Sequence, residues 1–468
     1  MIKIITSENY VAEKQYIFNV IFAIFLEIPF CVEFENRSDI CMQLSNNREI
    51  ILPDIFFSFR PEEWLTKKTL PVTPLMMFDV RKILDCVSFV SQIVPVIYGD
   101  NCYSVSDDGN KIRLPIDIFG SSFFMLTRYE EMVKTEKDQH GRFPLTASLS
   151  YQEGFLERPV VNEYVEILWA CLKKLCPSLT RKKYDYTVCI THDIDKLSTV
   201  IDRSWLNVLR NAVGDIYYRK SICLSMRRLF AKSFVNRQYQ YDPCVKTFDM
   251  IMDQVEKRGL KSAFYFIAGT SVEKDFDSDY DIREPVVRKI IKKIAVRGHE
   301  IGLHPSYATY KDCSLLKAEL NILQRITDEL GVNQKTWGGR QHYLRWENPM
   351  TWQNWEDAGF TYDSSLMYAE CVGFRCGTCY EYPVFNILTR RQLNLLERPL
   401  VVMDFVNASS EQKYYADWIN EKALRKIKNF RDTCRIFGGV YTLLFHNNGL
   451  MDKRHRAGFS ELLDFLVG

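Results

Sequence analysis

The sequence has 468 residues, 47% of them hydrophobic and 26% charged, which is the composition of a soluble globular protein with enough length for two domains. Lys and Arg number 61 against 59 Asp and Glu, a balance that gives no overall indication of nucleic-acid binding. Fourteen cysteines without a disulfide-like rhythm, and without a signal peptide before them, favour a reducing, cytoplasmic compartment.

Residues 1–180 are predicted to form the smaller domain, with a mixed α+β fold, because short apolar runs are interspersed there with longer helical patterns. The apolar run at 17–30 is too short to span a membrane and contains a glutamate and a proline, so it predicts a buried helix. Further helices are expected at 121–134 and 157–174. No cluster of catalytic groups occurs in this half, so its residues do not indicate a function.

A domain boundary is predicted at 176–183, where a helix ends at a proline and basic residues precede a new strand. From 181 to 468 strand and helix patterns alternate, which indicates an α/β fold with a parallel sheet, either open or closed into a barrel. The expected strands are 187–191, 262–268, 300–304, 336–342, 360–364, 400–405 and 440–446. The expected helices include 244–258, 284–297, 315–330 and 416–435.

The first of these strands ends in Thr191-His-Asp-Ile-Asp195, a group of polar residues that a buried strand does not tolerate without partners. Asp193 and Asp195 are two residues apart and point to the same side of an extended chain, so their like charges need a cation or a shared proton. In α/β barrels the active site lies at the carboxyl ends of the strands. The alternative is a solvated loop whose aspartate caps a helix.

Histidines also collect at the predicted strand ends. The sequence has seven, and four of them, His192, His304, His342 and His446, occupy such positions. A single histidine of this kind is more often structural, but four in the same placement indicate a shared site. His299 precedes its strand and is predicted to be structural instead.

From about residue 183 to the end, the sequence resembles the polysaccharide deacetylases of the NodB-homology type, carbohydrate esterase family four. The resemblance is carried by Thr191-His-Asp-Ile-Asp195, Arg297-Gly-His-Glu-Ile-Gly-Leu-His304, Gly339-Arg340 and Leu444-Phe-His446. It implies a distorted (β/α)7 barrel and a hydrolase, acting on carbon–nitrogen bonds other than peptide bonds, that removes acetyl groups from a polysaccharide or glycan precursor. Residues 1–180 resemble the uncharacterised domain that accompanies some of these deacetylases, from which no activity follows.

The same resemblance implies a divalent metal ion, expected to be Zn²⁺, held by Asp195 and His304. The second metal histidine of the family lies four residues after the first, where this chain has Ala308. Hydrolytic zinc sites usually have three protein ligands. Either His342, which stands where the family has a proline, supplies the third ligand, or the metal is weakly bound or absent; we predict the first.

The resemblance also implies catalytic roles. Asp193 corresponds to the general base, Arg340 to the arginine that holds this base, and His446 to the general acid. Asp363 ends the next predicted strand and is expected to orient Arg340 or His446. In an amide hydrolysis Asp193 would take the proton of the attacking water and His446 would protonate the departing amine.

Three tyrosine and arginine side chains are candidate substrate contacts. Tyr307 follows His304 closely, and Arg375 and Tyr380 flank the segment Cys376-Gly-Thr-Cys379. Two cysteines at this spacing form only half of a typical zinc site, so they predict a loop over the pocket rather than a metal ligand pair.

The segment 200–244 forms a long insertion after the first strand of the sheet. Its basic residues, among them Arg227, Arg228, Lys232 and Arg237, alternate with large apolar ones in an amphipathic pattern. This pattern suits either a helical lid packed on its own barrel or a peripheral contact with the inner face of a membrane.

Two other functions remain open from the sequence. One is a catalytically silent deacetylase-like barrel that binds a saccharide or a partner, and the other is a metal-dependent amidohydrolase acting on a non-sugar amide. The expected partner is an acetylated glycan or glycan precursor, with no nucleic acid, and the oligomeric state is not indicated.

Overall fold

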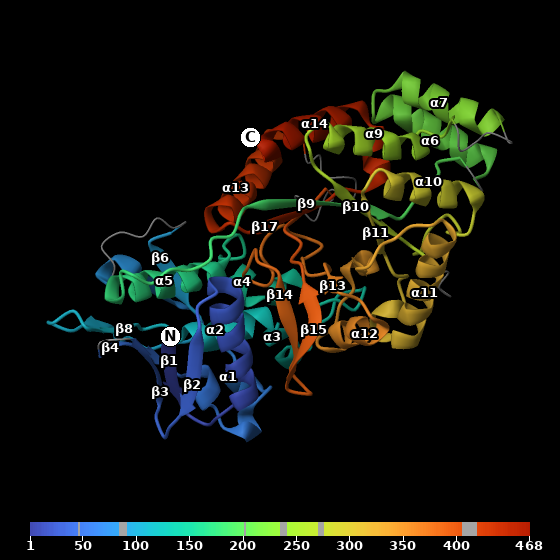
Figure 1. Cartoon of the computed structure of the whole chain (residues 1–468). Coiled ribbons are helices and arrows are strands. Elements are labelled where there is room, and N and C mark those ends of the chain that lie inside the picture. The colour runs from blue at the N-terminus through green and yellow to red at the C-terminus, as the bar shows by residue number, and fades with distance from the viewer. Residues whose placement is uncertain (45–46, 84–90, 201–202, 235–240, 270–275, 405–418) are drawn as a thin grey trace.

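The computed structural model describes residues 1–44, 47–83, 91–200, 203–234, 241–269, 276–404 and 419–468. Its N-terminal part, blue to teal in Figure 1, is built on a six-stranded mixed sheet in the order β2-β1-β3-β4-β8-β7. The strands are β1 (Ile2–Thr6), β2 (Phe30–Phe34), β3 (Asp39–Leu44), β4 (Arg48–Pro53), β7 (Ser104–Val105) and β8 (Lys111–Arg113), with a separate antiparallel pair, β5 (Met76–Asp79) and β6 (Ile93–Val96).

Apolar side chains of the helices in this part share one hydrophobic core with those of its strands. The helices are α1 (Val11–Phe18), which continues as a π-helix (Asn19–Leu26), α2 (Ile118–Leu126), α3 (Glu130–Val133), α4 (Leu149–Gln152) and α5 (Val160–Leu175). The predicted buried helix at 17–30 is therefore helical only to Leu26, because β2 begins at Phe30. The helix predicted at 121–134 is divided into α2 and α3, since Arg128 between them has a left-handed φ of 52°.

The second sheet has nine strands in the order β14-β15-β13-β12-β11-β10-β9-β17-β16. All seven predicted strands belong to it and pair in parallel with their neighbours. They are β9 (Thr187–Ile194), β10 (Ser262–Phe266), β11 (Glu300–Leu303), β12 (Gly338–Gly339), β13 (Tyr362–Asp363), β16 (Val402–Met403) and β17 (Val440–Leu444). An antiparallel hairpin that was not predicted, β14 (Tyr382–Asn386) and β15 (Arg391–Glu397), extends one edge.

The strand pairs of the described residues do not include one between the edge strands β14 and β16. The chain is thus shown to have a mixed α/β architecture, whereas closure of this sheet into the predicted seven-stranded barrel is not shown. In Figure 1 the helices α13, α14, α9, α10 and α11 follow an arc around the outside of the sheet. The helices are α6 (Trp205–Tyr217), α7 (Ile222–Ser233), α9 (Val245–Glu256), α10 (Pro285–Val296), α11 (Cys313–Glu329), α12 (Met350–Ala358), α13 (Glu421–Phe437) and α14 (Lys453–Val467).

The four helices predicted for this half are confirmed as α9, α10, α11 and α13, although residues 416–418 of the last lie outside the described residues. Among the helices of the described ranges, none combines the length and the hydropathy needed to cross a membrane.

Two close approaches between strands bring the polar strand ends together. The amide of His304 donates to the carbonyl of Phe266 on β10 (2.9 Å), and that of Arg340 donates to the carbonyl of Leu303 on β11 (3.1 Å). A Cβ atom on Gly339 would lie 1.8 Å from the carbonyl oxygen of Leu303, so only glycine permits this spacing of β11 and β12. The residues that follow these strands therefore meet at one edge of the sheet.

Candidate metal centre and active site

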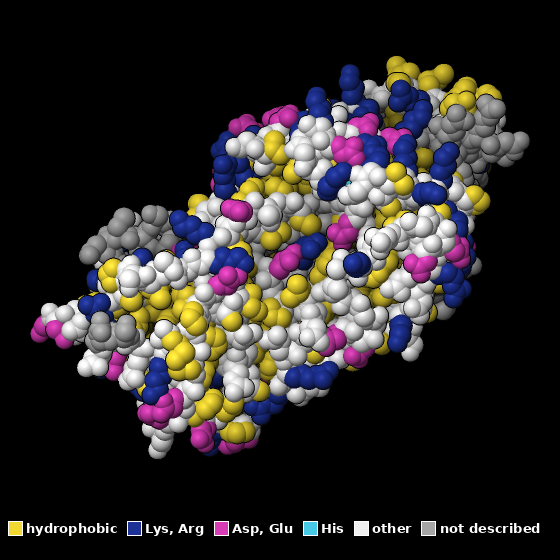
Figure 2. All heavy atoms as spheres, viewed as in Figure 1, with side chains coloured by type: hydrophobic (Ala, Val, Ile, Leu, Met, Phe, Trp, Pro, Cys, Tyr) yellow, Lys and Arg dark blue, Asp and Glu magenta, His cyan; other side chains and the backbone are white. Residues whose placement is uncertain are grey.

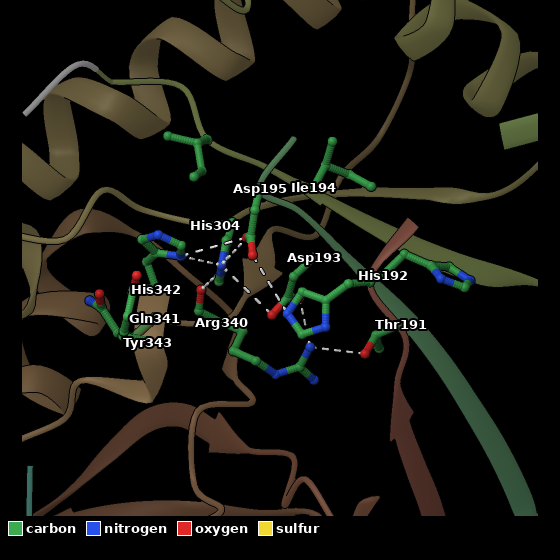
Figure 3. Close-up of polar contacts among 12 residues, drawn as sticks. Thr191, His192, Asp193, Ile194, Asp195, His304, Arg340, Gln341, His342 and Tyr343 are labelled. Atoms are coloured by element: carbon green, nitrogen blue, oxygen red, sulfur yellow. Dashed lines mark hydrogen bonds and ion pairs between the residues drawn. The ribbon is translucent and has the colours of Figure 1, made fainter. Parts of the chain in front are cut away.

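Three side chains from strand ends of the second sheet converge in Figure 3, two of them buried and that of Asp195 partly exposed. Asp195 follows β9, His304 follows β11, and His342 lies just beyond β12. Asp195 Oδ1 is 3.2 Å from His304 Nε2 and 3.6 Å from His342 Nδ1, and the two nitrogens are 2.8 Å apart. Zinc–ligand bonds of about 2.0–2.1 Å in a tetrahedral arrangement place ligand atoms about 3.3 Å apart. The trio thus has the dimensions of one face of a metal site.

The hydrogen bonds behind the two histidines fix which ring nitrogens carry protons. His304 Nδ1 lies 2.6 Å from the carbonyl oxygen of Arg340, and His342 Nε2 lies 2.6 Å from that of Phe276. A carbonyl only accepts, so each of these nitrogens donates and the opposite nitrogen of each neutral ring is bare. The bare nitrogens face each other and the carboxylate of Asp195.

Either a metal cation or a proton on His304 Nε2 satisfies these three atoms: burial opposes the charged ring, but the charges of Asp193 and Asp195 raise the pKa of His304. Among the described residues Asp195 Oδ1 is buried without a hydrogen bond, although both imidazoles approach it. Burial lowers the pKa of His342, which favours its neutral, ligating form. Two imidazoles and a carboxylate suit Zn²⁺ and other divalent ions, so the residues fit a metal. Asp195, His304 and His342 therefore lie together, without Ala308, and their binding of one metal stays a prediction.

Asp193 lies beside this trio but is held by a different group. Arg340 Nη1 donates to Asp193 Oδ1 (2.9 Å) and to Thr191 Oγ1 (2.9 Å), and the side chains of Arg340 and Asp193 are both buried. Arg340 is in turn anchored by donating to the carbonyl oxygen of Ser364 (2.8 Å) and to its hydroxyl (3.0 Å). Asp193 Oδ2 remains on the side of the trio, 3.7 Å from His304 Nε2. This arrangement fixes the carboxylate without making it one of the three convergent ligands.

His446, after β17, lies on another side of Asp195, with its Nε2 3.6 Å from Asp195 Oδ2. Asp404 accepts from both the backbone amide of His446 (2.8 Å) and its Nδ1 (2.7 Å). Burial disfavours the charged imidazole, but the charge and hydrogen bond of Asp404 outweigh it and raise the pKa of His446 to about 9. The ring is therefore held as a proton donor with Nε2 towards the site.

Asp404 was not predicted as a site residue, although its position at the end of a predicted strand indicates such a role. It lies directly after β16, within the strand predicted at 400–405, so it occupies a strand end like the other polar residues of the site. Asp363 was expected to orient Arg340 or His446, but Ser364 and Asp404 do so instead. The carboxyl of Asp363 accepts from the Ser365 hydroxyl, and burial raises its pKa to about 7. The structure gives Asp363 a supporting position behind the site.

The trio opens into a cavity of about 290 Å³. Its wall includes Asp193, His446, Lys196, Phe276 and Tyr343, and one residue from the N-terminal part of the chain. The cavity is at the small end of the range for small-molecule pockets.

The N-terminal contribution to this wall comes from the turn at 138–144, to which the sequence assigned no function. Arg142 lines the cavity while it donates to Asp138 Oδ2 (2.7 Å) and to the carbonyl oxygen of Tyr343 (2.8 Å). An earlier residue of the turn lies behind the wall, since His140 Nδ1 is 3.0 Å from the hydroxyl of Tyr307. The N-terminal part therefore forms one side of the pocket.

The three candidate substrate contacts do not line this cavity. Tyr307 is buried one layer behind it, with its ring stacked 4.5 Å from that of Phe276. Arg375 is buried in an ion pair with Glu131 (2.6 Å) at the contact with α3. Tyr380 donates to the carbonyl of Phe437 (2.7 Å) and lines a separate cavity of about 560 Å³. A direct contact of Arg375 or Tyr380 with a substrate at the trio has no support from the geometry.

The segment around Cys376 and Cys379 packs inside the protein rather than over the pocket. Both thiols are buried, and the carbonyl of Gly377 accepts from the amide of Val161 on α5 (2.8 Å). The prediction that this loop covers the pocket is wrong. The loop packs against α5, which is distant in the sequence, and a local pattern does not reveal such a contact.

Two other histidines are structural. His299 Nδ1 accepts from the amide of Ser262 (3.1 Å) and its Nε2 lies 2.9 Å from Glu256, as predicted for a position outside the site. His192 points away from the trio in Figure 3, with Nδ1 2.9 Å from the carbonyl oxygen of Phe445. Burial lowers its pKa to about 3, so it stays neutral. Three of the four strand-end histidines therefore belong to the site.

In the comparison with protein families, a match is found for the first part of the chain. Residues 2–177 match the model of a family of unknown function, DUF7033. The chain matches none of the curated proteins with which it was compared.

Solved structures give distant likenesses. A protein from Mycobacterium smegmatis described as a polysaccharide deacetylase is 16% identical, with a TM-score of 0.38, over 61% of this chain and 85% of that one. A polysaccharide deacetylase from Pseudomonas aeruginosa PAO1 is 14% identical, with a TM-score of 0.34, over 59% and 84%. A PuuE allantoinase is 11% identical, with a TM-score of 0.33, over 59% and 83%. Likenesses at this level carry no weight for function, which has to come from the site.

Proposed function

We propose that the protein is a metal-dependent hydrolase that removes N-acetyl, or O-acetyl, groups from a glycan or glycan precursor. The observation that carries this proposal is the trio of Asp195, His304 and His342, whose potential ligand atoms converge at one point. A carboxylate and an imidazole that are not part of this trio, Asp193 and His446, lie next to it. A cation site with a candidate general base and a candidate general acid beside it is an arrangement suited to hydrolysis of an acyl bond.

Each residue has a distinct task in this proposal. A divalent cation, when bound by the trio, would polarise the substrate carbonyl and make water a stronger nucleophile. Arg340 holds Asp193 by one oxygen, which leaves the other free to take the proton of the attacking water. Asp404 holds His446 by Nδ1, so its Nε2 is the atom that delivers a proton to the departing nitrogen or oxygen.

The preference for a sugar rests on the motif resemblance of residues 183–468 and on the form of the pocket. Phe276 and Tyr343 give the cavity aromatic faces, while Arg142 and Lys196 supply donors for hydroxyl groups. A cavity of about 290 Å³ accommodates a group of roughly one sugar ring. The N-terminal part takes part in substrate binding in this proposal because Arg142 is in the wall.

The test measures metal content and acetate release with the full-length protein. N-acetylglucosamine oligomers, acetylated xylan and an N-acetyl amino acid serve as substrates. Asp193→Asn is expected to retain metal and lose about 10²–10⁴-fold in turnover, as for loss of a general base. Asp195→Asn is expected to lose the metal. Asp312→Asn, which alters an exposed helix N-cap outside the lining of the cavity, is the matched control.

Each contrary outcome has a definite meaning. Metal binding without acetate release from any of the three substrates would contradict the hydrolase proposal and favour a silent, saccharide-binding protein. Release from the N-acetyl amino acid alone would replace the sugar by another amide. Equal metal loss in the Asp193 and Asp195 variants would show that the base and the ligand have been assigned to the wrong residues.

A further inference from the structure

The α6–α7 hairpin has a second apolar face that the rest of the described structure leaves uncovered. Its inner face is buried through Val208, Ala212, Leu224 and Ala231, which is sufficient to attach the two helices to the protein. The outer face repeats large apolar residues at helical spacing. On α6 these are Leu206, Leu209, Val213 and Ile216, and on α7 they are Ile222, Met226 and Phe230.

The exposure of this outer face is high for apolar side chains. Leu206 is 78% exposed, Ile222 67%, Val213 64% and Met226 61%. In Figure 2 the hydrophobic side chains at the upper right end of the molecule lie over α6 and α7, with Lys and Arg beside them. Single exposed apolar residues are normal, but a continuous patch of this kind marks an interaction surface.

The charged side chains that the hairpin itself exposes have one sign. Residues 203–234 contain seven Lys and Arg but only one acidic residue, Asp215. Asp215 is buried and ion-paired with Arg219 and Arg228, and Arg228 is itself buried. The solvent-facing side chains of 203–234 thus include no carboxylate, whereas Arg210, Lys220 and Arg227 are exposed.

We propose that the α6–α7 hairpin docks onto an anionic phospholipid bilayer, in the plane of the headgroups. Apolar stripes flanked only by cationic groups are the pattern of helices that lie in a membrane interface. Trp205, Tyr217 and Tyr218 are exposed on the same hairpin, and their amphipathic rings suit the headgroup region. A second copy of the hairpin fits less well, because two surfaces of the same positive sign would repel each other.

The buried Arg228–Asp215 pair also explains why the hairpin can act as a rigid docking element. Arg228 Nε donates to Asp215 Oδ2 (2.8 Å), and Lys232 Nζ donates to the carbonyl of Val200 (3.1 Å), so these cations are engaged in the fold. Of the basic residues Arg227, Arg228 and Lys232 of the amphipathic pattern, only Arg227 is exposed for lipid phosphates. Arg237 lies outside the described residues.

The experiment measures co-sedimentation of the full-length protein with phosphatidylcholine vesicles that do or do not contain phosphatidylglycerol. Binding is expected only with phosphatidylglycerol and to weaken as salt is raised. The triple variant Arg210→Gln, Lys220→Gln, Arg227→Gln is expected to bind on the order of 100-fold more weakly, since each basic residue near the surface contributes roughly fivefold. The apolar variant Leu206→Ser, Ile222→Ser is expected to bind more weakly as well.

The matched control removes the same three charges elsewhere, by Lys67→Gln, Lys317→Gln and Lys422→Gln, all at exposed positions outside the hairpin. It is expected to bind like the unmodified protein. The proposal is overturned by absence of vesicle binding at low salt, by equal binding to neutral vesicles, or by equal losses in the triple variant and its control. A dimer that dissociates in the apolar variant, with no vesicle binding, would assign the face to a second copy instead. None of these results depends on the proposed hydrolase activity.

Discussion

Replacement of Asp404 by Asn is expected to impair turnover through His446 while the metal trio stays intact. The change keeps the size of the side chain but removes the charge that faces Nδ1 of His446 at 2.7 Å. The pKa of His446 rises from 6.5 to about 9 in spite of burial, mainly because of Asp404. That rise corresponds to about 3 kcal/mol in favour of the imidazolium, at about 1.4 kcal/mol for each unit of pKa.

The expected loss can be worked out from these values. If the pKa returns to 6.5, the protonated fraction at pH 8 falls from about 90% to about 3%, roughly 30-fold. Misorientation of the ring adds to this loss, so a decrease in kcat of about 10²–10³-fold is expected, within the usual range for general acid catalysis. A general acid works below its pKa, so the fall in activity at high pH should move to lower pH in the variant.

The assay is the pH profile of kcat, with metal content measured on the same samples. Asp404→Glu keeps the charge and should restore part of the activity, while Asp312→Asn should behave like the unmodified protein. A kcat within threefold of the unmodified protein together with an unchanged profile would refute the role of His446 as an acid held by Asp404. Loss of metal in step with activity would show instead that Asp404 supports the trio.

Two further predictions concern buried groups outside the chemistry. Glu319 is buried and its pKa is raised to about 7, so the folded state binds more protons than the unfolded state between about pH 4.5 and 7 and stability falls as pH rises through that window. Glu319→Gln should flatten this dependence in urea unfolding at pH 5 and 8, and an unchanged slope would contradict the assignment. Arg375→Met should destabilise the fold by about 3 kcal/mol because it removes one partner of a buried pair, whereas Arg425→Met on the surface should cost less than about 0.5 kcal/mol. Equal effects of these two arginines would contradict the placement of Arg375.

The proximity of the three residues was predictable because parallel strands end at a common edge, whereas their role as metal ligands came from the motif resemblance. His304 and His342 lie just beyond β11 and β12, so their neighbourhood follows from strand order alone. The same reasoning extends to Asp404, which lies directly after β16. Positions of this kind are predictable because the residues that follow the carboxyl ends of parallel strands lie on the same side of the sheet.

Contacts between distant parts of the chain were not predictable in this way. Arg375 was placed at the substrate pocket because it stands in a loop with conspicuous cysteines, yet its partner Glu131 is 244 residues away. Arg142 enters the pocket wall from a turn that showed no chemistry of its own. The β14–β15 hairpin was not predicted. Buried and exposed residues alternate in β15, but its many charged and polar residues make a strand hard to recognise from the sequence.

Anomalous diffraction from crystals grown with zinc tests the metal centre most directly. The structure predicts a single strong peak among Asp195, His304 Nε2 and His342 Nδ1, at about 2.0–2.2 Å from each ligand atom. A His342→Ala crystal under the same conditions should show a weaker peak or none. Absence of a peak in the unmodified protein, or a peak that His342 does not coordinate, would contradict the account of this site.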